Sequence, residues 1–362
     1  MMFATGCSVL TSFEGFDSNA SKAPAPASTC TATQLDCDGD PQNGCETDVT
    51  RSAVHCGACG RSCLRGACER GSCLPFELAT GQAQPSRVVV DASHVYWVNQ
   101  GDPGAVMRRR LDAGAPETVW SAGKIPGGLA VDADAVYWSQ LENGGSVFRL
   151  AKSDVGTATP PRELATAQGG SISVAVDATH VYWTTPNTVR RAPKLGGALE
   201  TLAREQDSPF ALVVDVGRLF WTNYRGGQVM TVLLSSPVPT PLATGQGSPA
   251  GLAGDLSALY WTNNQAGPGG APPAVMTLPK AVSGSAPAVL ADRQSAPAGV
   301  AVFGNDVFWA NSGDGTIGRV AKQGGAISVV ASSQATPSDV AVDATAIYWV
   351  NRDDGRVMAI VR

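Results

Sequence analysis

Seven copies of one twelve-residue segment constrain the fold of this chain more than any other sequence feature. Each copy is an apolar run, a short turn and an aromatic residue followed by tryptophan, as in VVVDASHVYWVN (88–99), LAVDADAVYWSQ (129–140), VAVDATHVYWTT (174–185), LVVDVGRLFWTN (212–223), LAGDLSALYWTN (252–263), VAVFGNDVFWAN (300–311) and VAVDATAIYWVN (340–351). Their tryptophans recur every 38 to 48 residues. A period of this size predicts a repeat architecture in which one structural unit occurs seven times.

Each repeat unit has the pattern of four short β-strands. The apolar run is followed by the aromatic–tryptophan strand, a third strand such as TIGRVAK or RVMAIVR, and a brief fourth strand such as RELATA. β-Branched and aromatic residues between Gly, Pro and Asn turns favour strands over helices. Four-stranded units of about 40–45 residues predict the blades of a β-propeller.

The two ends of the repeat region predict how the propeller closes. The seventh unit stops at Arg362 after three strands, and its missing fourth strand is found before the first unit as FELATGQAQP (76–85), which matches PLATGQGSP (241–249). Pairing these segments removes the open sheet edges. We therefore predict an all-β fold: a seven-bladed β-propeller over residues 75–362, closed by an N-terminal outer strand and preceded by a small disulfide-rich module.

The aromatic–tryptophan dipeptide resembles the YWTD repeat of low-density-lipoprotein-receptor-type propellers, most closely in FWTN (220–223) and YWTN (260–263). The resemblance covers residues 75–362 and implies the propeller architecture. Those proteins commonly have six blades and an Asp after Trp-Thr, whereas this chain mostly has Asn at that place. Seven occurrences of the aromatic pair favour a packing role, in which large rings fill the wedge between neighbouring blades.

Eight of the nine cysteines lie within residues 30–74, a segment with no hydrophobic period. Small cysteine-dense modules are typical of oxidising, extracytoplasmic compartments. An even number predicts four disulfides, formed by Cys30, Cys37, Cys45, Cys56, Cys59, Cys63, Cys68 and Cys73. The motifs DCDGDPQNGCETD and HCGACGRSC resemble a Cys-rich module of myxobacterial surface proteins, which implies location more than activity.

Two metal sites are alternatives within this module. Thiolates and imidazole are zinc ligands, and the chain offers them at His55, Cys56, Cys59 and Cys63. The oxidising context favours disulfides over this zinc site. Oxygen-bearing side chains suit a structural Ca²⁺, and the chain offers a cluster of them at Asp36, Asp38, Asp40, Asn43, Glu46 and Asp48, of which the first four are the main candidates. The other interpretation of this cluster is a set of polar turns. No other cofactor is expected.

The amino terminus predicts a lipid anchor at Cys7. The sequence ATGCS, with small residues before the cysteine, resembles a bacterial lipobox. Only six residues precede Cys7, so we expect the natural start to lie upstream. Ser8 favours the outer membrane, and residues 1–29 are interpreted as a lipoprotein-like N-terminus with a flexible tether. The alternative is an accidental TGC in a disordered tail.

Alternating strand direction assigns each loop to one of two faces of the propeller. The turns after the first strands carry a repeated aspartate, at Asp91, Asp132, Asp177, Asp215, Asp255 and Asp343. A carboxylate in such a turn accepts backbone hydrogen bonds, so we predict turn stabilisation rather than a ring of ion ligands. His94 and His180 occupy equivalent positions on this face and are predicted to be surface residues, not a catalytic pair.

The loops that enter the blades on the opposite face predict a ligand site. They carry Gln82, Gln168, Gln206, Gln246, Gln294 and Gln334, with Lys124 in the remaining loop. We predict that these side chains form a near-complete ring around one channel mouth. Further amides on this face come from Asn223, Asn263, Asn311 and Asn351. The alternative is structural, with each carboxamide connecting backbone groups of adjacent blades. The long loop 263–274 is expected to cover part of the mouth.

Composition narrows the classes of function. A net charge of -5 without a basic tract argues against a nucleic-acid partner. After Cys73 the chain has no cysteine and two histidines, so no acid, base and nucleophile set is evident. We predict a non-catalytic, monomeric cell-surface or outer-membrane lipoprotein whose propeller binds a protein or glycan. Its membrane contact is expected only through the lipid, because no apolar run reaches the ~18 residues of a span.

Two other functions are alternatives. A metal-dependent hydrolase or lyase would use acidic loop residues at the channel mouth, for which the candidates are Asp102, Glu142, Asp314, Asp353 and Asp354. A purely structural envelope component would need no ligand. The fold alone does not decide between them, because one fold supports unrelated functions.

Overall fold

The computed structural model describes residues 30–40, 42–121, 123–142, 144–280 and 285–362. The chain divides into two compact units. One is the cysteine-rich unit, which extends to Cys63 and includes Cys68–Ser72; the other comprises Leu64–Ala67 and Cys73–Arg362 and contains the propeller. The predicted lipidation site Cys7 and the tether lie outside the described residues. Within the described ranges, no helix has the length and apolar character needed to cross a membrane.

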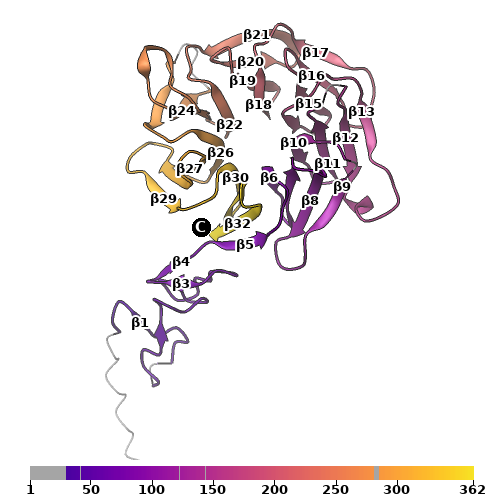
Figure 1. The fold of residues 1–362 in the computed structure, drawn as a ribbon. Coiled ribbons are helices and arrows are strands. Elements are labelled where there is room, and N and C mark those ends of the chain that lie inside the picture. Colours follow the sequence, from indigo (N-terminus) through magenta and orange to yellow (C-terminus); the bar gives the residue numbers. More distant parts are fainter. Residues whose placement is uncertain (1–29, 41, 122, 143, 281–284) are drawn as a thin grey trace, which may run out of the picture. The chain divides into compact units, whose positions relative to one another are not determined.

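Seven antiparallel four-stranded sheets follow one another in a ring and form the blades of the propeller (Figure 1). Blade 1 consists of β6 (Pro85–Val90), β7 (His94–Asn99), β8 (Ala105–Arg110) and β9 (Glu117–Ser121). Blade 2 consists of β10 (Pro126–Val131), β11 (Ala135–Gln140), β12 (Val147–Ala151) and β13 (Arg162–Ala165). Blade 3 consists of β14 (Val174–Val176), β15 (His180–Thr184), β16 (Val189–Pro193) and β17 (Glu200–Ala203).

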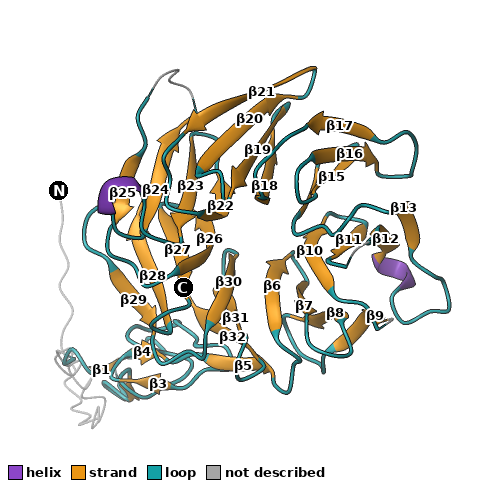
Figure 2. Cartoon of the chain, turned by 45° about the horizontal axis from the view of Figure 1, so that its top comes forward, coloured by secondary structure: helices purple, strands orange, loops and turns teal. Residues whose placement is uncertain are grey.

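The next three blades repeat this order. Blade 4 consists of β18 (Pro209–Asp215), β19 (Arg218–Asn223), β20 (Gln228–Leu233) and β21 (Ser236–Ala243). Blade 5 consists of β22 (Pro249–Gly254), β23 (Ala258–Asn263), β24 (Ala274–Pro279) and β25 (Ala288–Ala291). Blade 6 consists of β26 (Pro297–Phe303), β27 (Asp306–Asn311), β28 (Thr316–Ala321) and β29 (Ser328–Ala331). Short 3-10 turns occur at η1 (Lys152–Asp154) and η2 (Pro268–Gly270), and strands dominate the rest (Figure 2).

Blade 7 confirms the predicted closure of the ring. Its strands are β30 (Pro337–Val342), β31 (Ala346–Asn351), β32 (Arg356–Val361) and, from the other end of the repeat region, β5 (Phe76–Ala79). β32 pairs antiparallel with β5, and Val357 lies opposite Ala79. The first strand of the repeat region therefore completes the last blade, as expected for a closed seven-bladed propeller.

The aromatic–tryptophan pair packs between the blades, as predicted. All seven repeat tryptophans have 0% exposure. Successive residues of a strand point to opposite faces of the sheet, so the two rings of one pair contact different neighbouring blades. Tyr182 shares a core cluster with Trp221 of the next blade, while Trp183 shares one with Tyr137 of the previous blade. The same exchange recurs around the ring and buries both faces of every blade.

The cysteine-rich segment is stabilised by disulfides, as predicted. Its eight cysteines pair as Cys30–Cys45, Cys37–Cys59, Cys56–Cys68 and Cys63–Cys73. Its strands are β1 (Gln34–Leu35), β2 (Thr47–Asp48), β3 (Cys68–Glu69) and β4 (Ser72–Cys73). The zinc alternative is wrong, because oxidised sulfurs do not supply the thiolate ligands of zinc. The Nδ1 atom of His55 accepts a hydrogen bond from the Gly60 N–H instead.

Candidate functional site

The repeated glutamines connect the blades. In six blades the Gln Oε1 accepts a hydrogen bond from the indole Nε1 of the tryptophan at 2.8–3.1 Å, in the pairs Gln82–Trp97, Gln168–Trp183, Gln206–Trp221, Gln246–Trp261, Gln294–Trp309 and Gln334–Trp349. The backbone N–H of the same Gln donates to a loop of the preceding blade, for example from Gln82 to the Gly355 carbonyl at 2.9 Å. We name this arrangement the glutamine latch.

Five asparagines complete the latch. Their Nδ2 atoms donate to the same Gln Oε1 at 3.0–3.1 Å, from Asn99, Asn223, Asn263, Asn311 and Asn351. These asparagines are only 2–8% exposed. The carboxamides predicted as ligand contacts thus bond within the blade, which supports the structural alternative. Ligand binding by the predicted Gln and Asn side chains stays a prediction.

Blade 3 keeps a modified latch. Thr185 stands where five other blades have Asn, and it bonds to Thr188 instead, with 2.6 Å between the two hydroxyl oxygens. The second donor to Gln168 Oε1 is the guanidinium of Arg190, at 2.9 Å. A charged donor on the neighbouring strand therefore replaces the missing amide.

Blade 2 has no latch, although Lys124 takes the backbone place of the Gln, as predicted. Gly104 packs closely against the backbone of Lys124, because a Cβ on this glycine would lie 2.2 Å from the Lys124 carbonyl oxygen. Gly355 packs in the same way against the backbone of Gln82, the latch residue of blade 1. A lysine ammonium donates hydrogen bonds and cannot accept one. The indole Nε1 of Trp138 is accordingly buried without a partner among the described residues.

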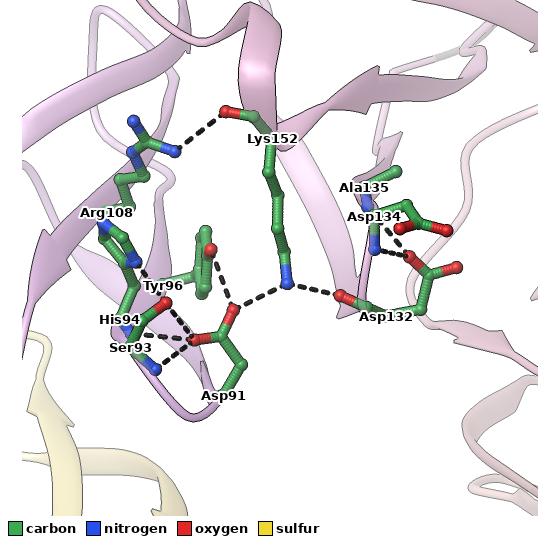
Figure 3. A network of polar contacts seen from close by, with 9 residues as sticks. All are labelled: Asp91, Ser93, His94, Tyr96, Arg108, Asp132, Asp134, Ala135 and Lys152. Carbon is green, nitrogen blue, oxygen red and sulfur yellow. Dashed lines mark hydrogen bonds and ion pairs between the residues drawn. The ribbon is translucent and has the colours of Figure 1, made fainter.

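On the opposite face, five of the six repeated aspartates stabilise their turns, as predicted (Figure 3), whereas Asp215 makes no such turn hydrogen bond among the described residues and pairs with Lys280. Asp91 Oδ1 accepts hydrogen bonds from the backbone N–H groups of Ser93 and His94 at 2.7 and 2.8 Å. Its other oxygen, Oδ2, accepts from the Tyr96 hydroxyl at 3.0 Å. Lys152 of the next blade forms an ion pair with this Oδ2 at 2.6 Å, and Figure 3 shows the same ammonium reaching the Asp132 carbonyl.

Four such lysine–aspartate clasps connect adjacent blades. In each, a lysine that follows a third strand reaches the turn aspartate of the preceding blade; the pairs are Lys152–Asp91, Lys194–Asp132, Lys280–Asp215 and Lys322–Asp255. The equivalent position holds Leu111 in blade 1 and Leu234 in blade 4. In blade 7 it holds Arg362, whose guanidinium carbon lies 4.4 Å from the ring centroid of Phe303. These partners support a structural role for the aspartates over an ion-binding ring.

Three of the clasp carboxylates, those of Asp91, Asp132 and Asp255, are kept ionised. Partial burial opposes the charge of Asp91, but hydrogen bonds from Lys152, two backbone N–H groups and Tyr96 lower the pKa of Asp91 well below its usual range. The same balance of burial against hydrogen bonds lowers the pKa values of Asp132 and Asp255. Burial raises the pKa of Tyr137 to about 12. Groups held in one protonation state fit a structural role better than acid–base chemistry.

The channel mouth on the latch face holds a cavity of about 450 Å³. Its lining comes mainly from the start of each first strand and from the residue after the asparagine position. None of the latch glutamines belongs to this lining, so the predicted Gln ring does not surround the cavity. The reason is geometric, since each carboxamide is turned toward the indole of its blade. The long loop 263–274 contributes Asn264 to the lining.

The blades contribute different side chains to the mouth. Blades 2 to 4 form an apolar arc of Leu141, Ile172, Phe210 and Tyr224. Blades 5 to 7 and blade 1 form a polar arc that includes Asn264, Ser312, Ser338, Arg352, Arg87 and Gln100. The lining of this cavity contains arginines but no Asp or Glu, although the whole chain has a net charge of -5.

Arg87 and Phe210 meet across the channel, from β6 of blade 1 and β18 of blade 4. The guanidinium carbon lies 5.1 Å from the Phe210 ring centroid. Both residues line the mouth and also a deeper cavity of about 530 Å³ formed by the first strands of all seven blades. The pair therefore marks the floor of the mouth. No other residue in the described ranges forms a hydrogen bond or ion pair with the Arg87 side chain, so its donors are free for a ligand.

Asp339 on β30 is the acidic neighbour of Arg87. Its Oδ2 accepts a hydrogen bond from the Val88 N–H at 3.1 Å. Burial raises the pKa of Asp339, and the nearby Arg87 opposes this shift in part. Gly299 permits the close packing, because a Cβ there would lie 2.1 Å from Asp339 Oδ1. Blades 2 to 6 hold small residues at this repeat position: Gly128, Ser173, Ala211, Gly251 and Gly299.

The repeat alignment did not predict Arg87, Asp339 or the apolar arc, because it compared the tryptophan segments and not the starts of the first strands. A signal was present in the sequence. Most first strands begin with a proline, and the second residue after this proline is small in blades 4 to 6. The same position holds Arg87 in blade 1 and Asp339 in blade 7. Two charged residues of opposite sign, in adjacent blades and at a position that is otherwise small, indicate a role beyond the packing of one blade.

Three acidic loop residues of the enzymatic alternative accept hydrogen bonds from their own loop or from the loop that enters the same blade. Glu142 Oε1 accepts from the Ile125 N–H at 3.2 Å, and Asp314 Oδ1 accepts from the Thr316 hydroxyl at 2.7 Å. Asp353 accepts a hydrogen bond from the Thr336 hydroxyl. None of these carboxylates lines the mouth cavity.

The predicted calcium residues are arranged as turns. Oxygen atoms of Asp36 and Asp38 lie with one of Glu46 within 4.8 Å of one another. Asp36 accepts from the Gly39 N–H, Asp38 from the Asp40 N–H and from the Asn43 Nδ2 atom, and Asp40 from the Gln42 N–H, all at 2.8–2.9 Å. These bonds support the turn interpretation. Calcium at Asp36, Asp38, Asp40 and Asn43 stays a prediction, and Glu46 of the predicted oxygen cluster lies beside Asp36 and Asp38.

Comparison with known proteins supports the fold alone. The chain matches no protein-family model and no curated protein. Virginiamycin B lyase from Staphylococcus aureus is 14% identical, with a TM-score of 0.67 over 80% of this chain and 98% of that chain. A catalytically inactive His-to-Ala variant of that lyase with quinupristin is 15% identical, with a TM-score of 0.65 over 80% and 99%. The WD40 β-propeller domain of Doa1 is 14% identical, with a TM-score of 0.65 over 80% and 97%. The propeller architecture implied by the repeat is thus confirmed.

Proposed function

We propose that this protein is a non-catalytic binding protein of an extracytoplasmic compartment, and that a protein or glycan ligand contacts the propeller at the channel mouth. The observation that carries this proposal is the mouth cavity, whose lining differs from blade to blade while the latch beside it is repeated. A concave, partly apolar cavity with a few polar groups is the general form of a ligand site.

Four disulfides support the proposed compartment, because such bonds persist in oxidising surroundings. We further propose that a lipid on Cys7 anchors a monomer at the outer membrane or cell surface. Mass spectrometry of the N-terminal peptide from membrane fractions is expected to show the lipid. A Cys7→Ser variant is expected to move to the soluble fraction. An unmodified cysteine in membrane-bound protein would remove the anchor from the proposal.

The composition of the mouth favours binding over catalysis. Its lining contains no His, Asp or Glu, the side chains that most often transfer protons or hold catalytic metals. His94 and His180, the two propeller histidines, begin second strands on the opposite face. The Staphylococcus aureus lyase, by contrast, is inactive as a His-to-Ala variant. These facts weaken the alternative of a metal-dependent hydrolase or lyase.

The full chain can test the proposal on a glycan array and on purified envelope proteins. Ile172→Arg, which places a charge in the apolar arc, is expected to abolish retention of the ligand. Leu256→Arg is the matched control, because Leu256 is 89% exposed in a turn on the opposite face. If only Leu256→Arg abolished retention of the ligand, the binding site would lie on the opposite face. No retained ligand with the wild-type chain would favour a structural envelope component, and metal-dependent turnover would favour the enzyme.

A further inference from the structure

We propose that the channel mouth takes a ring-bearing carboxylic acid, whose carboxylate pairs with Arg87 and whose apolar ring lies against the apolar arc. The acid is either a free small molecule or the end group of a larger ligand. Because the mouth must be a binding site for this to hold, the inference rests on the proposed function and adds the chemistry of the ligand.

The charge of the mouth favours an anion. Arg87 and Arg352 are the charged residues of its lining, and no acidic residue accompanies them there. The other described residues give neither side chain a hydrogen bond or an ion pair. Asp339 borders the deeper cavity, and Asp353 beside the rim is engaged by Thr336. Burial disfavours the charged form of Asp339, which weakens its competition for Arg87.

Arg87 is held in a suitable position for a carboxylate. Its contact with the Phe210 ring holds the guanidinium group at the floor of the mouth. A planar guanidinium presents paired donors that match the two oxygens of a carboxylate. Ser86, the preceding residue, is 8% exposed and lines the same cavity, and its Oγ is buried without a partner among the described residues. The hydroxyl is a second polar group at this end of the mouth.

The apolar arc favours a flat apolar ring. Phe210 and Tyr224 lie 5.5 Å apart between ring centroids, with an interplanar angle of 37°. The Tyr224 hydroxyl accepts from Gln265 Nε2 at 3.1 Å and lies 3.3 Å from Asn264 Oδ1, so the ring is fixed before a ligand arrives. Leu141 and Ile172 continue the same side of the cavity. A volume of about 450 Å³ is within the range of small-molecule sites.

The test is calorimetric titration of the full chain with 2-naphthaleneacetate. Four matched probes separate the contributions: 2-(2-naphthyl)ethanol lacks the charge, hexanoate lacks the ring, 2-naphthyl phosphate changes the anion, and glucuronate replaces the apolar ring by a sugar. We expect 2-naphthaleneacetate to bind at least tenfold more tightly than each of the four. Arg87→Met is expected to weaken this binding at least tenfold, and Phe210→Leu by roughly three- to tenfold.

Arg218→Met is the matched control and should bind like wild type, because Arg218 is exposed at the start of β19 on the opposite face. Circular dichroism checks that each variant is folded. Equal affinity for the acid and the alcohol, or unchanged affinity in folded Arg87→Met, would overturn the carboxylate anchor. Tighter binding of the phosphate or of glucuronate would overturn the ligand class.

The outcome also separates this inference from the proposed function. If no probe binds but Ile172→Arg still abolishes retention of an envelope ligand, the acid is wrong and the mouth remains a binding site. If no probe binds and Ile172→Arg leaves every retained ligand unaffected, both proposals are wrong.

Discussion

The glutamine latch and the channel mouth lie on the same face of the propeller, yet their residues are distributed in opposite ways. The latch repeats the same Gln–Trp hydrogen bond in six blades. The mouth uses the residue just after the asparagine position, and there the side chains change from blade to blade: Gln100, Leu141, Tyr224, Asn264, Ser312 and Arg352. Side chains one to three residues apart at the end of one strand thus have different roles.

The difference shows how a closed repeat separates stability from recognition. Every blade buries an indole N–H, and a buried donor without an acceptor costs about 1–3 kcal/mol. Six blades supply a carboxamide for this donor, and blade 2 leaves the Trp138 Nε1 without a partner among the described residues. The mouth side chains face one cavity shared by all blades, and no blade depends on a particular residue there. Repetition therefore marks what the fold needs, and variation marks what a single ligand would need.

Removing one glutamine latch tests whether the repeated residues stabilise the fold, and it has the largest expected effect. Gln246→Leu leaves the Trp261 Nε1 and the Asn263 Nδ2 atom without their shared acceptor. Both groups are buried, so we expect the free energy of unfolding to fall by about 2–5 kcal/mol. Urea unfolding of the full chain followed by tryptophan fluorescence measures the change.

The latch-free blade supplies the control. Lys124 is exposed and accepts no bond from Trp138, so Lys124→Leu should change the free energy of unfolding by less than about 0.5 kcal/mol. Similar losses for Gln246→Leu and Lys124→Leu would show that the latch does not carry the stability assigned to it.

The clasp on the opposite face is the next largest contribution. Lys152→Met removes the ion pair with Asp91, in which both side chains are 18% exposed. We expect the free energy of unfolding at pH 7 to fall by about 1–3 kcal/mol, the range for hydrogen bonds to charged groups. Leu234→Met is the matched control at the equivalent position of blade 4 and should cost less than about 1.5 kcal/mol.

The clasp also predicts a pH dependence. The folded pKa of Asp91 is lowered below its unfolded value of about 3.9. The contribution of Asp91 is therefore fully present above about pH 4 and is lost as the pH falls toward the folded pKa. Unfolding of the wild type between pH 6 and pH 2 should show this loss, and Lys152→Met should show less of it. Parallel curves for the two proteins would contradict a stabilising clasp.

Much of the fold could be predicted from the sequence, because its causes are local and repeated. The period of the tryptophans gave the blade number, and the FELATG segment at the start predicted the closure with β32. The role of the glutamines could not be chosen from their residue type, since a carboxamide both donates and accepts. A fixed spacing was the overlooked signal: each latch Gln precedes its Trp by 15 residues.

The mouth could not be predicted in the same way. Arg87 and Phe210 meet only because blades 1 and 4 face each other across the channel. No local pattern joins two residues so far apart in the chain. The lysine–aspartate clasp could be predicted only in part. Its lysines occupy one repeat position, which the sequence shows. Their aspartate partners lie in the preceding blade, and this pairing follows only from the packing of adjacent blades.

Building the missing latch would sharpen the comparison. Lys124→Gln places a carboxamide oxygen in the loop of blade 2, where Trp138 Nε1 has no partner among the described residues. We expect the free energy of unfolding to rise by about 1 kcal/mol, the usual net value of a hydrogen bond. Lys124→Leu, which has no acceptor, is the control in the same urea experiment. No gain would show that this loop, one residue shorter before its proline, holds the side chain out of reach of the indole.

A substitution in the channel mouth is expected to have the smallest effect on stability. Arg87→Met keeps an unbranched stem in the channel and loses no protein hydrogen bond, because the guanidinium has no acceptor among the described residues. The lost contact with Phe210 contributes about 0.5–1 kcal/mol, so the free energy of unfolding at pH 7 should change by little more than this. A loss as large as that of Gln246→Leu would make Arg87 a structural residue and would remove the contrast between latch and mouth.

The pH dependence of that small change identifies its cause. Burial raises the folded pKa of Asp339, and Arg87 opposes the shift, so Arg87→Met should raise this pKa further. A carboxyl group with a raised folded pKa loses stability as the pH rises above its unfolded value of about 3.9. The difference between Arg87→Met and wild type should therefore shrink below about pH 4, where Asp339 is protonated in both the folded and unfolded states. The part that persists there measures the contact with Phe210, and the part that disappears measures the attraction between Arg87 and Asp339 that a ligand carboxylate would have to replace.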